Sequence, residues 1–266
     1  MPQNVAKLTS AKNPFLESVR RAARAGRPTE DGSLVVEGPH LVAEALHGGC
    51  VMRRVVTTER GRELYSGLLG QLQVQITEVS ARAFAATAST ETAQEILALV
   101  GWRAASWRKL AGPQALIVAL DGMQDPGNAG TIVRSAEAFG ASGVVLLEGS
   151  VRVPNGKFLR ATTGSIFRLP LLESVTRTEF LEQVRSLGLP LYALTSRDGT
   201  SLRKANFRVP CALVVGGEGN GVSTELLGAA SPLSIPARNV ESLNAAIACS
   251  LALFEAARQR ENGEGI

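Results

Sequence analysis

The residues best suited to chemistry lie in the second half of this 266-residue chain, where polar side chains follow apolar segments. The first group is DGMQDPGNAGTIVRSAEAFG at 121–140, in which we expect Asn128 to cap a helix and Arg134 to lie about two turns further along it. Ile132 and Val133 flank Arg134, and a guanidinium is costly to bury unless it meets an anion or a carboxylate. An anionic ligand and a structural ion pair would satisfy Arg134 equally well.

A second group is rich in glycine and reads VVGGEGNGVS at 214–223. Several glycines at the end of an expected strand indicate that the backbone comes close to a ligand. The spacing is not that of a dinucleotide-binding GxGxxG, and no Gly-Lys-Ser/Thr follows, so a phosphate-binding loop is excluded as well. Glu218 could accept hydrogen bonds or orient a cation in this turn, or it could simply be an exposed acid.

The third group, LSIPARNVESLNAAIACSL at 233–251, opens the last expected helix. Ser242 is a good helix cap, which places Leu243 and Asn244 in the first turn. Backbone donors at a helix start can bind a polar ligand. Asn244 could face such a ligand, or it could be a surface residue of the first turn.

Apolar runs alternate with helical segments from residue 115 onward, which predicts an α/β domain with a mostly parallel sheet. Ligands of such sheets bind at the carboxyl ends of the strands, where the polar groups are found. We expect strands at 115–122, 143–149, 190–196 and 211–219, and helices at 128–139, 181–188 and 242–260.

The chain before residue 101 also alternates between short strands and helices, which predicts a smaller α/β sandwich. Asn13 and Pro14 begin its first helix, and Gly26 ends it. This helix is basic and could present its cations to the phosphates of a nucleic acid, although a solvated face explains them equally well. We expect helices at 13–25, 39–46 and 60–70, and strands at 33–38, 52–58, 72–79 and 95–100.

Residues 101–113 read as a connector, because they carry Trp102 and Trp107 beside basic residues and close on Gly-Pro. A tryptophan at a domain junction is more often a packed anchor than a platform for bases, and we favour the anchor. The expected domains are therefore 1–103 and 114–266, joined by a linker at 104–113.

The composition excludes several classes of protein. Lys and Arg number 28 against 24 Asp and Glu, so the formal net charge of +4 is too small for a histone-like polycation. Three cysteines without a CxxC pair and only two histidines argue against a disulfide framework and against a metal site. Without a transmembrane segment or a secretory signal in the sequence, we expect a cytoplasmic protein with no membrane partner.

The order of the three polar groups is more specific than any one of them. NxGxxxR, then GGEGxGxS after a late strand, then IPxxxxxSLNxA before the last helix together resemble the SpoU/TrmH family of RNA ribose 2′-O-methyltransferases, part of the SPOUT superfamily. The likeness spans 115–260 and includes FLRATTGSIFRLP at 158–170. The N-terminal VVEGPHLVAEAL resembles the substrate-binding domain of that family, which has an L30e-like fold.

The resemblance implies a C-terminal SPOUT domain with a trefoil knot that binds S-adenosylmethionine. It also implies a homodimer packed through this domain, with both subunits contributing to the active site. Positions 217 and 237–239 depart from the usual family pattern, at the cofactor rather than at polar catalytic residues. The polar catalytic site would consist of Asn128, Arg134, Glu218, Ser242 and Asn244. The cofactor would be surrounded by Gly216, Gly217, Glu218, Ile235, Ala237, Leu243, Asn244 and Ala246.

The implied reaction moves a methyl group to a ribose 2′-hydroxyl in structured RNA. No histidine lies in the motifs, and an arginine gives up a proton reluctantly, so we expect Arg134 to clamp the adjacent phosphate and polarise the hydroxyl. Ribosomal RNA is the favoured substrate and transfer RNA the second choice. An antibiotic-resistance role and a non-catalytic RNA-binding protein on the same scaffold are alternatives. The residues expected to bind the RNA are Lys12, Arg20, Arg21 and Arg24.

Overall fold

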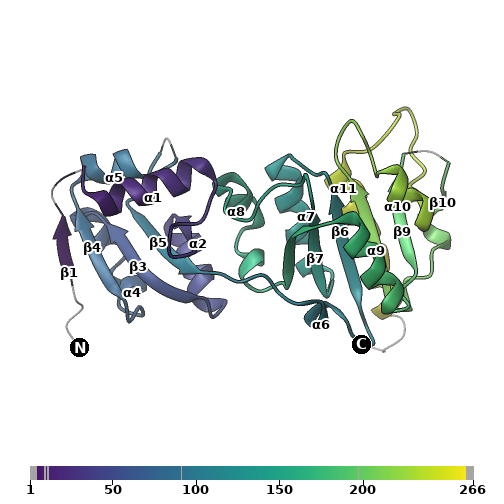
Figure 1. Ribbon diagram of the computed structural model, residues 1–266, viewed down its shortest axis with the longest axis horizontal. Coiled ribbons are helices and arrows are strands. Elements are labelled where there is room, and N and C mark those ends of the chain that lie inside the picture. The colour runs from purple at the N-terminus through teal and green to yellow at the C-terminus, as the bar shows by residue number, and fades with distance from the viewer. Residues whose placement is uncertain (1–4, 9, 11, 91, 197, 262–266) are drawn as a thin grey trace. The chain divides into compact units, whose positions relative to one another are not determined.

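The structure is a computed structural model that describes residues 5–8, 10, 12–90, 92–196 and 198–261 (Figure 1). The chain divides into two compact units. The N-terminal unit comprises residues 1–103 and 153–167, and the C-terminal unit comprises residues 104–152 and 168–266. No helix within the described ranges is long and apolar enough to span a lipid bilayer.

A five-stranded mixed sheet forms the centre of the N-terminal unit, in the order β1-β4-β3-β5-β2. β5 runs antiparallel to both of its neighbours, whereas β4 pairs in parallel with β1 and β3. The sequence predicted each of these strands except β1, a short edge strand whose residues VAKL contain no apolar run. The strands are β1 Val5–Leu8, β2 Ser33–Glu37, β3 Val51–Thr57, β4 Gln75–Val79 and β5 Ile96–Gly101.

The basic helix expected at 13–25 is α1, Pro14–Ala25. The Oδ1 atom of Asn13 accepts a hydrogen bond of 2.9 Å from the backbone N–H of Phe15, and Gly26 ends the helix with a φ of 57°. The predicted cap and end of this helix are therefore confirmed. Its buried residues are Leu16, Val19 and Ala22. The neighbouring helices are α2 Pro39–His47, α3 Glu59–Leu64, α4 Ser66–Leu69 and the unpredicted α5 Ala81–Thr87.

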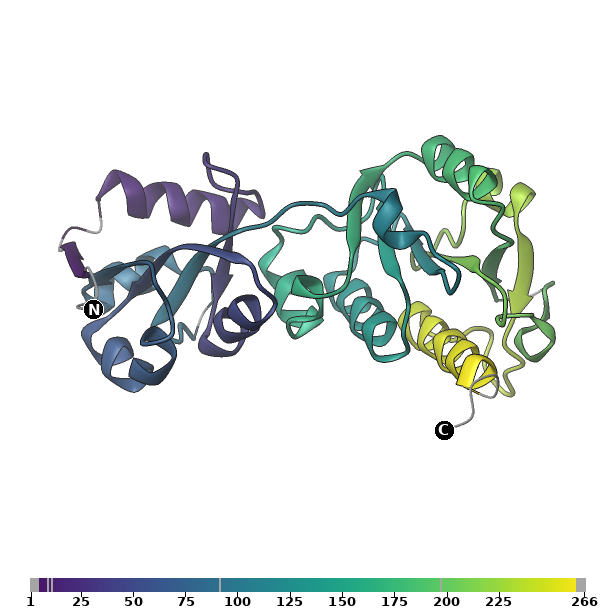
Figure 2. The same cartoon turned by 90° about the horizontal axis from the view of Figure 1, so that it is seen from below.

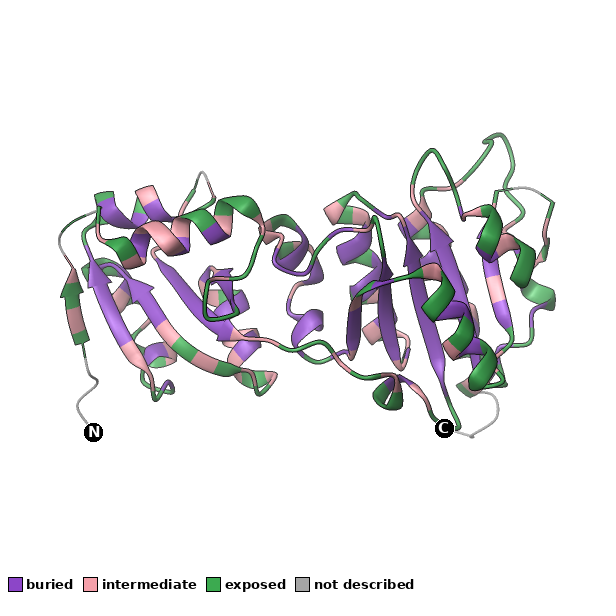
Figure 3. Cartoon of the chain, in the orientation of Figure 1, coloured by how far each residue is buried: buried purple, intermediate pink, exposed green. Residues whose placement is uncertain are grey.

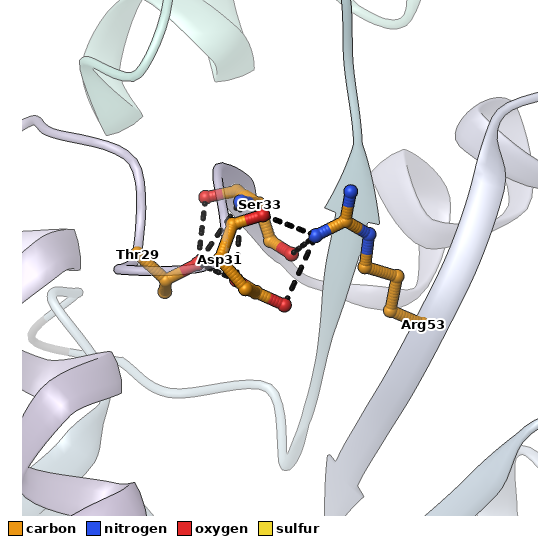
Figure 4. A network of polar contacts seen from close by, with 4 residues as sticks. All are labelled: Thr29, Asp31, Ser33 and Arg53. Atoms are coloured by element: carbon orange, nitrogen blue, oxygen red, sulfur yellow. Dashed lines mark hydrogen bonds and ion pairs between the residues drawn. The ribbon is translucent and has the colours of Figure 1, made fainter.

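The turn between α1 and β2 is held by a polar network around Asp31 (Figure 4). The carboxylate of Asp31 accepts hydrogen bonds from the hydroxyl of Thr29 and the backbone N–H of Ser33. It also forms an ion pair of 3.0 Å with the guanidinium of Arg53 on β3. The hydrogen bond from Thr29, assisted by those from Ser33 and Arg53, lowers the pKa of Asp31 to about 2. The network thus fixes the turn that follows the basic helix.

A helix from the middle of the chain belongs to the N-terminal unit. It is α8, Gly156–Thr162, which packs against β2 (Figures 1 and 2). Phe158 and Leu159 of α8 are buried, and a Cβ atom at Gly48 would lie only 2.9 Å from the Cβ of Phe167. The sequence alone placed 153–167 in the second domain, because an isolated apolar segment does not reveal which sheet it covers.

Seven strands form the sheet of the C-terminal unit, in the order β10-β12-β9-β11-β6-β7-β8. They pair in parallel, which confirms the predicted α/β domain with a mostly parallel sheet. The strands β8, β10 and β12 were not predicted, because they are short and partly polar. The strands are β6 Leu116–Asp121, β7 Gly143–Leu147, β8 Leu171–Val175, β9 Leu191–Thr195, β10 Thr200–Ser201, β11 Cys211–Gly216 and β12 Ser231–Ser234.

Helices cover both faces of this sheet (Figure 2). On one face, Ile117 and Val145 share a core cluster with Phe180 of α9 and Leu226 of α10. On the other face, α7 and α11 lie side by side. The central strands are buried along their length, as Figure 3 shows. The helices of this unit are α6 Trp107–Leu110, α7 Pro126–Ala138, α9 Arg177–Ser186, α10 Thr224–Ala229 and α11 Ala245–Glu261.

Trp107 at the start of the C-terminal unit is a packed anchor. Its ring centroid lies 6.2 Å from that of Phe180, and its Nε1 atom donates a hydrogen bond of 3.1 Å to Glu179. Both partners belong to α9, so Trp107 attaches the connector to the C-terminal unit itself.

Candidate functional site

The carboxyl ends of β6, β11 and β12 lie at the same edge of the C-terminal sheet, because these strands run in the same direction. Residues 122–125, 217–223 and 235–244 follow them and contain most of the polar residues singled out in the sequence. A pocket of about 900 Å³ is lined by the last two of these segments. Its volume is typical of a site for a small molecule.

The loop after β11 requires its glycines for geometric reasons. A Cβ atom on Gly216 would overlap the backbone of Gly221, and one on Gly217 would lie 2.6 Å from the carbonyl oxygen of Gly122. Gly219 and Gly221 have φ angles of 94° and 63°, which side chains disfavour. The loop therefore folds back on itself and presents backbone atoms to the pocket. A side chain at position 217 would therefore crowd the carbonyl oxygen of Gly122.

Three of the expected catalytic residues meet in one hydrogen-bonded group, which we call the amide–carboxylate cluster. The Nδ2 atom of Asn128 donates to Oε1 of Glu218 at 2.8 Å, and Nδ2 of Asn244 donates to the same oxygen at 2.7 Å. Asn244 also donates to Oδ1 of Asn128 at 3.1 Å. The cluster therefore joins α7, the glycine-rich loop and the start of α11.

The cluster depends on how α7 begins. The predicted cap at Asn128 is wrong, because the helix begins one turn earlier at Pro126 and is capped by Asp125. The Oδ1 atom of Asp125 accepts a hydrogen bond of 2.7 Å from the backbone N–H of Asn128. Asn128 thus lies inside the first turn, where its side-chain amide points to Glu218.

The cap of α11 is Asn244, and the predicted cap at Ser242 is wrong. The Oδ1 atom of Asn244 accepts hydrogen bonds from the backbone N–H groups of Ala246 and Ile247, at 3.0 and 3.2 Å. Its Nδ2 atom donates to the cluster, so one side chain both begins the helix and serves the site. Ser242 is exposed in the pocket wall.

The pocket wall contains nearly all residues expected around the cofactor. Ala246 is the exception, because it is buried in α11 and does not line the pocket. Thr195 and Ser196, at the carboxyl end of β9, also line it and were not predicted, although their place at the end of an expected strand was a usable signal. The expected residues that line the pocket are Gly216, Gly217, Glu218, Ile235, Ala237, Leu243 and Asn244.

Arg134 lies apart from the amide–carboxylate cluster. It is exposed on α7, because the helix turns its neighbours Ile132 and Val133 into the core. Within the described part of the chain it forms no ion pair, so the structural ion pair considered above is not found there. An outward-facing guanidinium is available to a phosphate or to a second protein chain.

A buried carboxylate beneath the glycine-rich loop was not predicted. Asp121, the last residue of β6, is 3% exposed and binds the guanidinium of Arg177 and the backbone N–H of Ser223. An acid that ends an apolar strand needs a partner, and this was a usable signal. Its partner Arg177 is 56 residues away, which no local pattern reveals. Asp121 and Arg177 also line a second pocket, of about 450 Å³, that shares the glycine-rich loop.

The basic residues expected to bind RNA lie on the outside of the N-terminal unit. Lys12, Arg21 and Arg24 are exposed, and Arg20 is half-buried with its guanidinium 3.8 Å from the carboxylate of Glu17. An ion pair of this length at the surface contributes little to stability. The basic face is therefore available to an anionic partner.

Two protein families match parts of the sequence. The SpoU rRNA Methylase family matches residues 115–254, and the MRM3-like substrate binding domain matches residues 19–98. The two matches cover the parallel-sheet half of the chain and the mixed-sheet half, respectively. The predicted architecture, a SPOUT-type domain preceded by a smaller substrate-binding domain, agrees with both.

Similar proteins match along nearly the whole chain. The 23S rRNA (guanosine(2553)-2′-O)-methyltransferase RlmP of Bacillus subtilis is 30% identical, over 93% of this chain and 97% of its own length. The AdoMet-bound rRNA methyltransferase of Sinorhizobium meliloti superposes with a TM-score of 0.84 at 29% identity, covering 96% of this chain and 98% of that one. The SpoU methyltransferase AviRb of Streptomyces viridochromogenes, in complex with AdoMet, has a TM-score of 0.84 at 26% identity, and the match covers 94% of this chain and 98% of AviRb. Since the family matches more than half of the residues of this chain, the chain belongs to the SpoU rRNA methylase family.

Proposed function

We propose that this protein transfers the methyl group of S-adenosylmethionine to a ribose 2′-hydroxyl of ribosomal RNA in the cytoplasm. The observation that carries the proposal is the amide–carboxylate cluster of Asn128, Glu218 and Asn244 beside a pocket of about 900 Å³. The names of the Bacillus and Sinorhizobium relatives support ribosomal RNA in preference to transfer RNA. A decayed scaffold that only binds RNA would have no need of this cluster.

The pocket suits S-adenosylmethionine in size and in chemistry. The backbone of the glycine-rich loop provides polar groups, while Ile235 and Leu243 provide apolar surface. The crowding at Gly216 and Gly217 keeps side chains out of this part of the wall. When bound, the cofactor supplies an activated methyl group. We propose that the cofactor is bound by the expected residues that line the pocket. Ala246 is not one of them, because it is buried in α11.

The side chains of the site position the RNA ribose. Glu218 accepts hydrogen bonds from two asparagines, which hold its carboxylate in one orientation. Ser242 and Asn244 position the ribose from the pocket wall. Arg134 clamps the adjacent phosphate and polarises the 2′-hydroxyl, and its guanidinium stays protonated throughout. The hydroxyl proton passes to water.

A second copy of the chain completes the site. Ile247, Leu251 and Phe254 are 54%, 42% and 54% exposed, and their spacing puts them on one face of α11. Such an apolar strip is suited to a second copy of the C-terminal unit. Arg134 faces outward from the neighbouring α7, which supports a site to which both subunits contribute. A trefoil knot formed by the segments around the pocket remains part of the proposal.

The N-terminal unit selects the RNA. Lys12, Arg20, Arg21 and Arg24 are its proposed phosphate contacts, on the outer side of α1 and just before it. The domain boundaries at 103 and 114 remain predictions, with 153–167 belonging to the first unit by its contacts.

Methyl transfer from tritiated S-adenosylmethionine tests the proposal. An unmodified 23S ribosomal RNA transcript should accept label, and bulk transfer RNA should not. Alkaline hydrolysis should leave the label in a resistant dinucleotide, because a methylated 2′-oxygen cannot attack the adjacent phosphate. Label in a base would contradict the proposed reaction. Calorimetry that detects no binding of S-adenosylmethionine would favour a non-catalytic RNA-binding protein.

A further inference from the structure

Two exposed cations outside the basic helix face solvent from the N-terminal unit. They are Lys157 and Arg160 of α8, three residues apart and therefore on neighbouring turns of one helix face. The buried side of the same helix carries Phe158 and Leu159. The core thus holds α8 in place while its two cations point outward.

The start of α8 touches the end of α1. A Cβ atom on Gly26, the C-cap of α1, would lie 3.5 Å from the Cα atom of Asn155, the N-cap of α8. Ala23 of α1 and Arg160 of α8 also line the same small pocket. Figure 1 shows α8 next to this end of α1. The two helices therefore form a continuous part of the surface of the N-terminal unit.

Four cations of this surface have no acidic partner in the part of the chain that the structure describes, whereas Arg20 forms the weak ion pair with Glu17. Arg21 and Arg24 on α1, like both cations of α8, form no ion pair among the residues that the structure describes. The nearby acid Glu37, which lines the small pocket with Arg160, already accepts hydrogen bonds from the backbone of Ser89 and the hydroxyl of Thr90. Unpaired cations on a rigid surface are suited to a polyanion, whose phosphates recur at short intervals.

We propose that α1 and α8 form one RNA-binding surface, in which Lys157 and Arg160 bind phosphates in addition to those bound by α1. The inference rests on the proposed function, because it assumes that RNA is the substrate. It adds to the phosphate contacts expected on α1 those of a helix that lies, in the sequence, between two strands of the C-terminal unit. The basic helix alone presents one row of cations. Together with the cations of α8, this row forms a broader basic surface that can bind a folded RNA.

Salt-dependent RNA binding tests the surface. The double variant K157A/R160A and the wild-type protein are titrated with an unmodified 23S ribosomal RNA transcript between 50 and 300 mM KCl, concentrations chosen to span the range in which phosphate contacts dominate. We expect the slope of log Kd against log salt to fall by about 1 to 2, because each lost phosphate contact removes roughly 0.7–0.9 from the slope. Affinity at low salt should fall about tenfold or more.

A matched control removes two exposed arginines from the C-terminal unit, in the double variant R185A/R208A. This control should keep the wild-type slope, since the net charge changes equally in both proteins. An equal loss in the control, or an unchanged slope in K157A/R160A, would overturn the inference. The variant R21A/R24A separates this outcome from failure of the proposed function. If only R21A/R24A weakens binding, RNA is bound without α8; if the wild-type protein shows no binding, the proposed function fails.

Discussion

The carboxylate of Asp121 binds the guanidinium of Arg177 through two contacts to Oδ1, of 2.8 Å from Nε and 2.6 Å from Nη2. Its other oxygen, Oδ2, accepts a hydrogen bond of 2.7 Å from the backbone N–H of Ser223. The backbone carbonyl of Asp121 accepts a further hydrogen bond of 3.0 Å from the N–H of Gly217. Asp121 therefore holds both ends of the loop that carries Glu218.

Replacement of Asp121 by Asn should change the conformation of this loop more than it lowers the stability of the fold. Asn cannot satisfy Arg177 and Ser223 with two charged oxygens, so we expect at least a tenfold loss of S-adenosylmethionine affinity, measured by calorimetry. The free energy of unfolding should fall by about 3 kcal/mol or less, because Arg177 is partly exposed and can be solvated. Glu137→Gln, which weakens the ion pair with Arg168 on the same unit, is the control and should leave cofactor affinity unchanged. Wild-type affinity in D121N would contradict this role.

Arg134→Ala should lower methyl transfer at least a hundredfold while S-adenosylmethionine binding stays nearly intact. The side chain is exposed and forms no ion pair within the described residues, so its loss should cost little stability. Arg134→Lys should recover only part of the activity, because it keeps the charge but not the planar fork. Single-turnover assays and calorimetry separate the two effects. Activity of R134A within a few-fold of wild type would exclude this mechanism.

Co-expression of two inactive variants tests whether the site is shared between subunits. R134A and E218Q are each expected to be inactive as homodimers. In a mixed dimer, one of the two sites would combine the intact Arg134 of one subunit with the intact Glu218 of the other, so purified mixed dimers should show about half of the wild-type activity. No recovery in purified mixed dimers would place both residues of each site on one chain.

Phe254→Glu should produce monomers. A carboxylate at the C-terminal end of the strip formed by Ile247, Leu251 and Phe254 would have to be buried in the interface without a partner. Sedimentation velocity should show a dimer for the wild-type protein and a monomer for F254E, with an unchanged circular dichroism spectrum. Glu255→Gln, next to Phe254 in α11, is the matched control and should stay dimeric. A wild-type protein that sediments as a monomer at micromolar concentration would rule out the homodimer.

Thiol labelling should distinguish the three cysteines. Burial raises the pKa of Cys211 to about 11 and that of fully buried Cys249 to about 12, so neither forms the reactive thiolate near pH 8. Burial also raises the pKa of Cys50, although this side chain is only half-buried. A disulfide reagent should therefore label one thiol in the folded protein, slowly, and all three after unfolding. C50S should lose the labelling of the folded state, and fast labelling of two thiols would contradict the burial.

Acid should weaken the network of Figure 4 in a defined pH range. The pKa of Asp31 is lowered from 3.8 to about 2 by its hydrogen bonds and by Arg53, so its stabilising effect is present above pH 4 and is lost as the pH falls towards 2. Because the side chain is 54% exposed, the effect on the unfolding free energy should be at most about 1 kcal/mol. The difference in melting temperature between wild type and D31N should shrink between pH 4 and pH 2. A constant difference would show that the charge of Asp31 is unimportant.

The sequence predicted the parts of the site that short motifs carry. Asn128, Glu218 and Asn244 were recognised by type and spacing, and the parallel sheet explains why their segments meet. The helix caps were misplaced by a few residues, because Asn128 and Ser242 are good caps and only tertiary contacts select Asp125 and Asn244.

Long-range partners could not be predicted in this way. The pairing of Asp121 with Arg177 and the packing of α8 against β2 depend on contacts between distant segments. The outward direction of Arg134 follows from the rotation of α7 about its own axis, which is set by the packing of Ile132, Val133 and Ala136 in the core. Short edge strands such as β1 and β10 lack the apolar run that reveals a buried strand.

Because α8 belongs to the N-terminal unit, this unit cannot be separated from the chain by a single cut. The chain passes from one unit to the other three times, after residues 103, 152 and 167, so the N-terminal unit is discontinuous in the gene. A fragment that stops at 103 would lack α8 and expose the apolar surface that Phe158 and Leu159 cover. A chimera that exchanges RNA specificity between relatives must therefore carry residues 153–167 together with the first 103, and a simple fusion at one junction would separate residues that fold together.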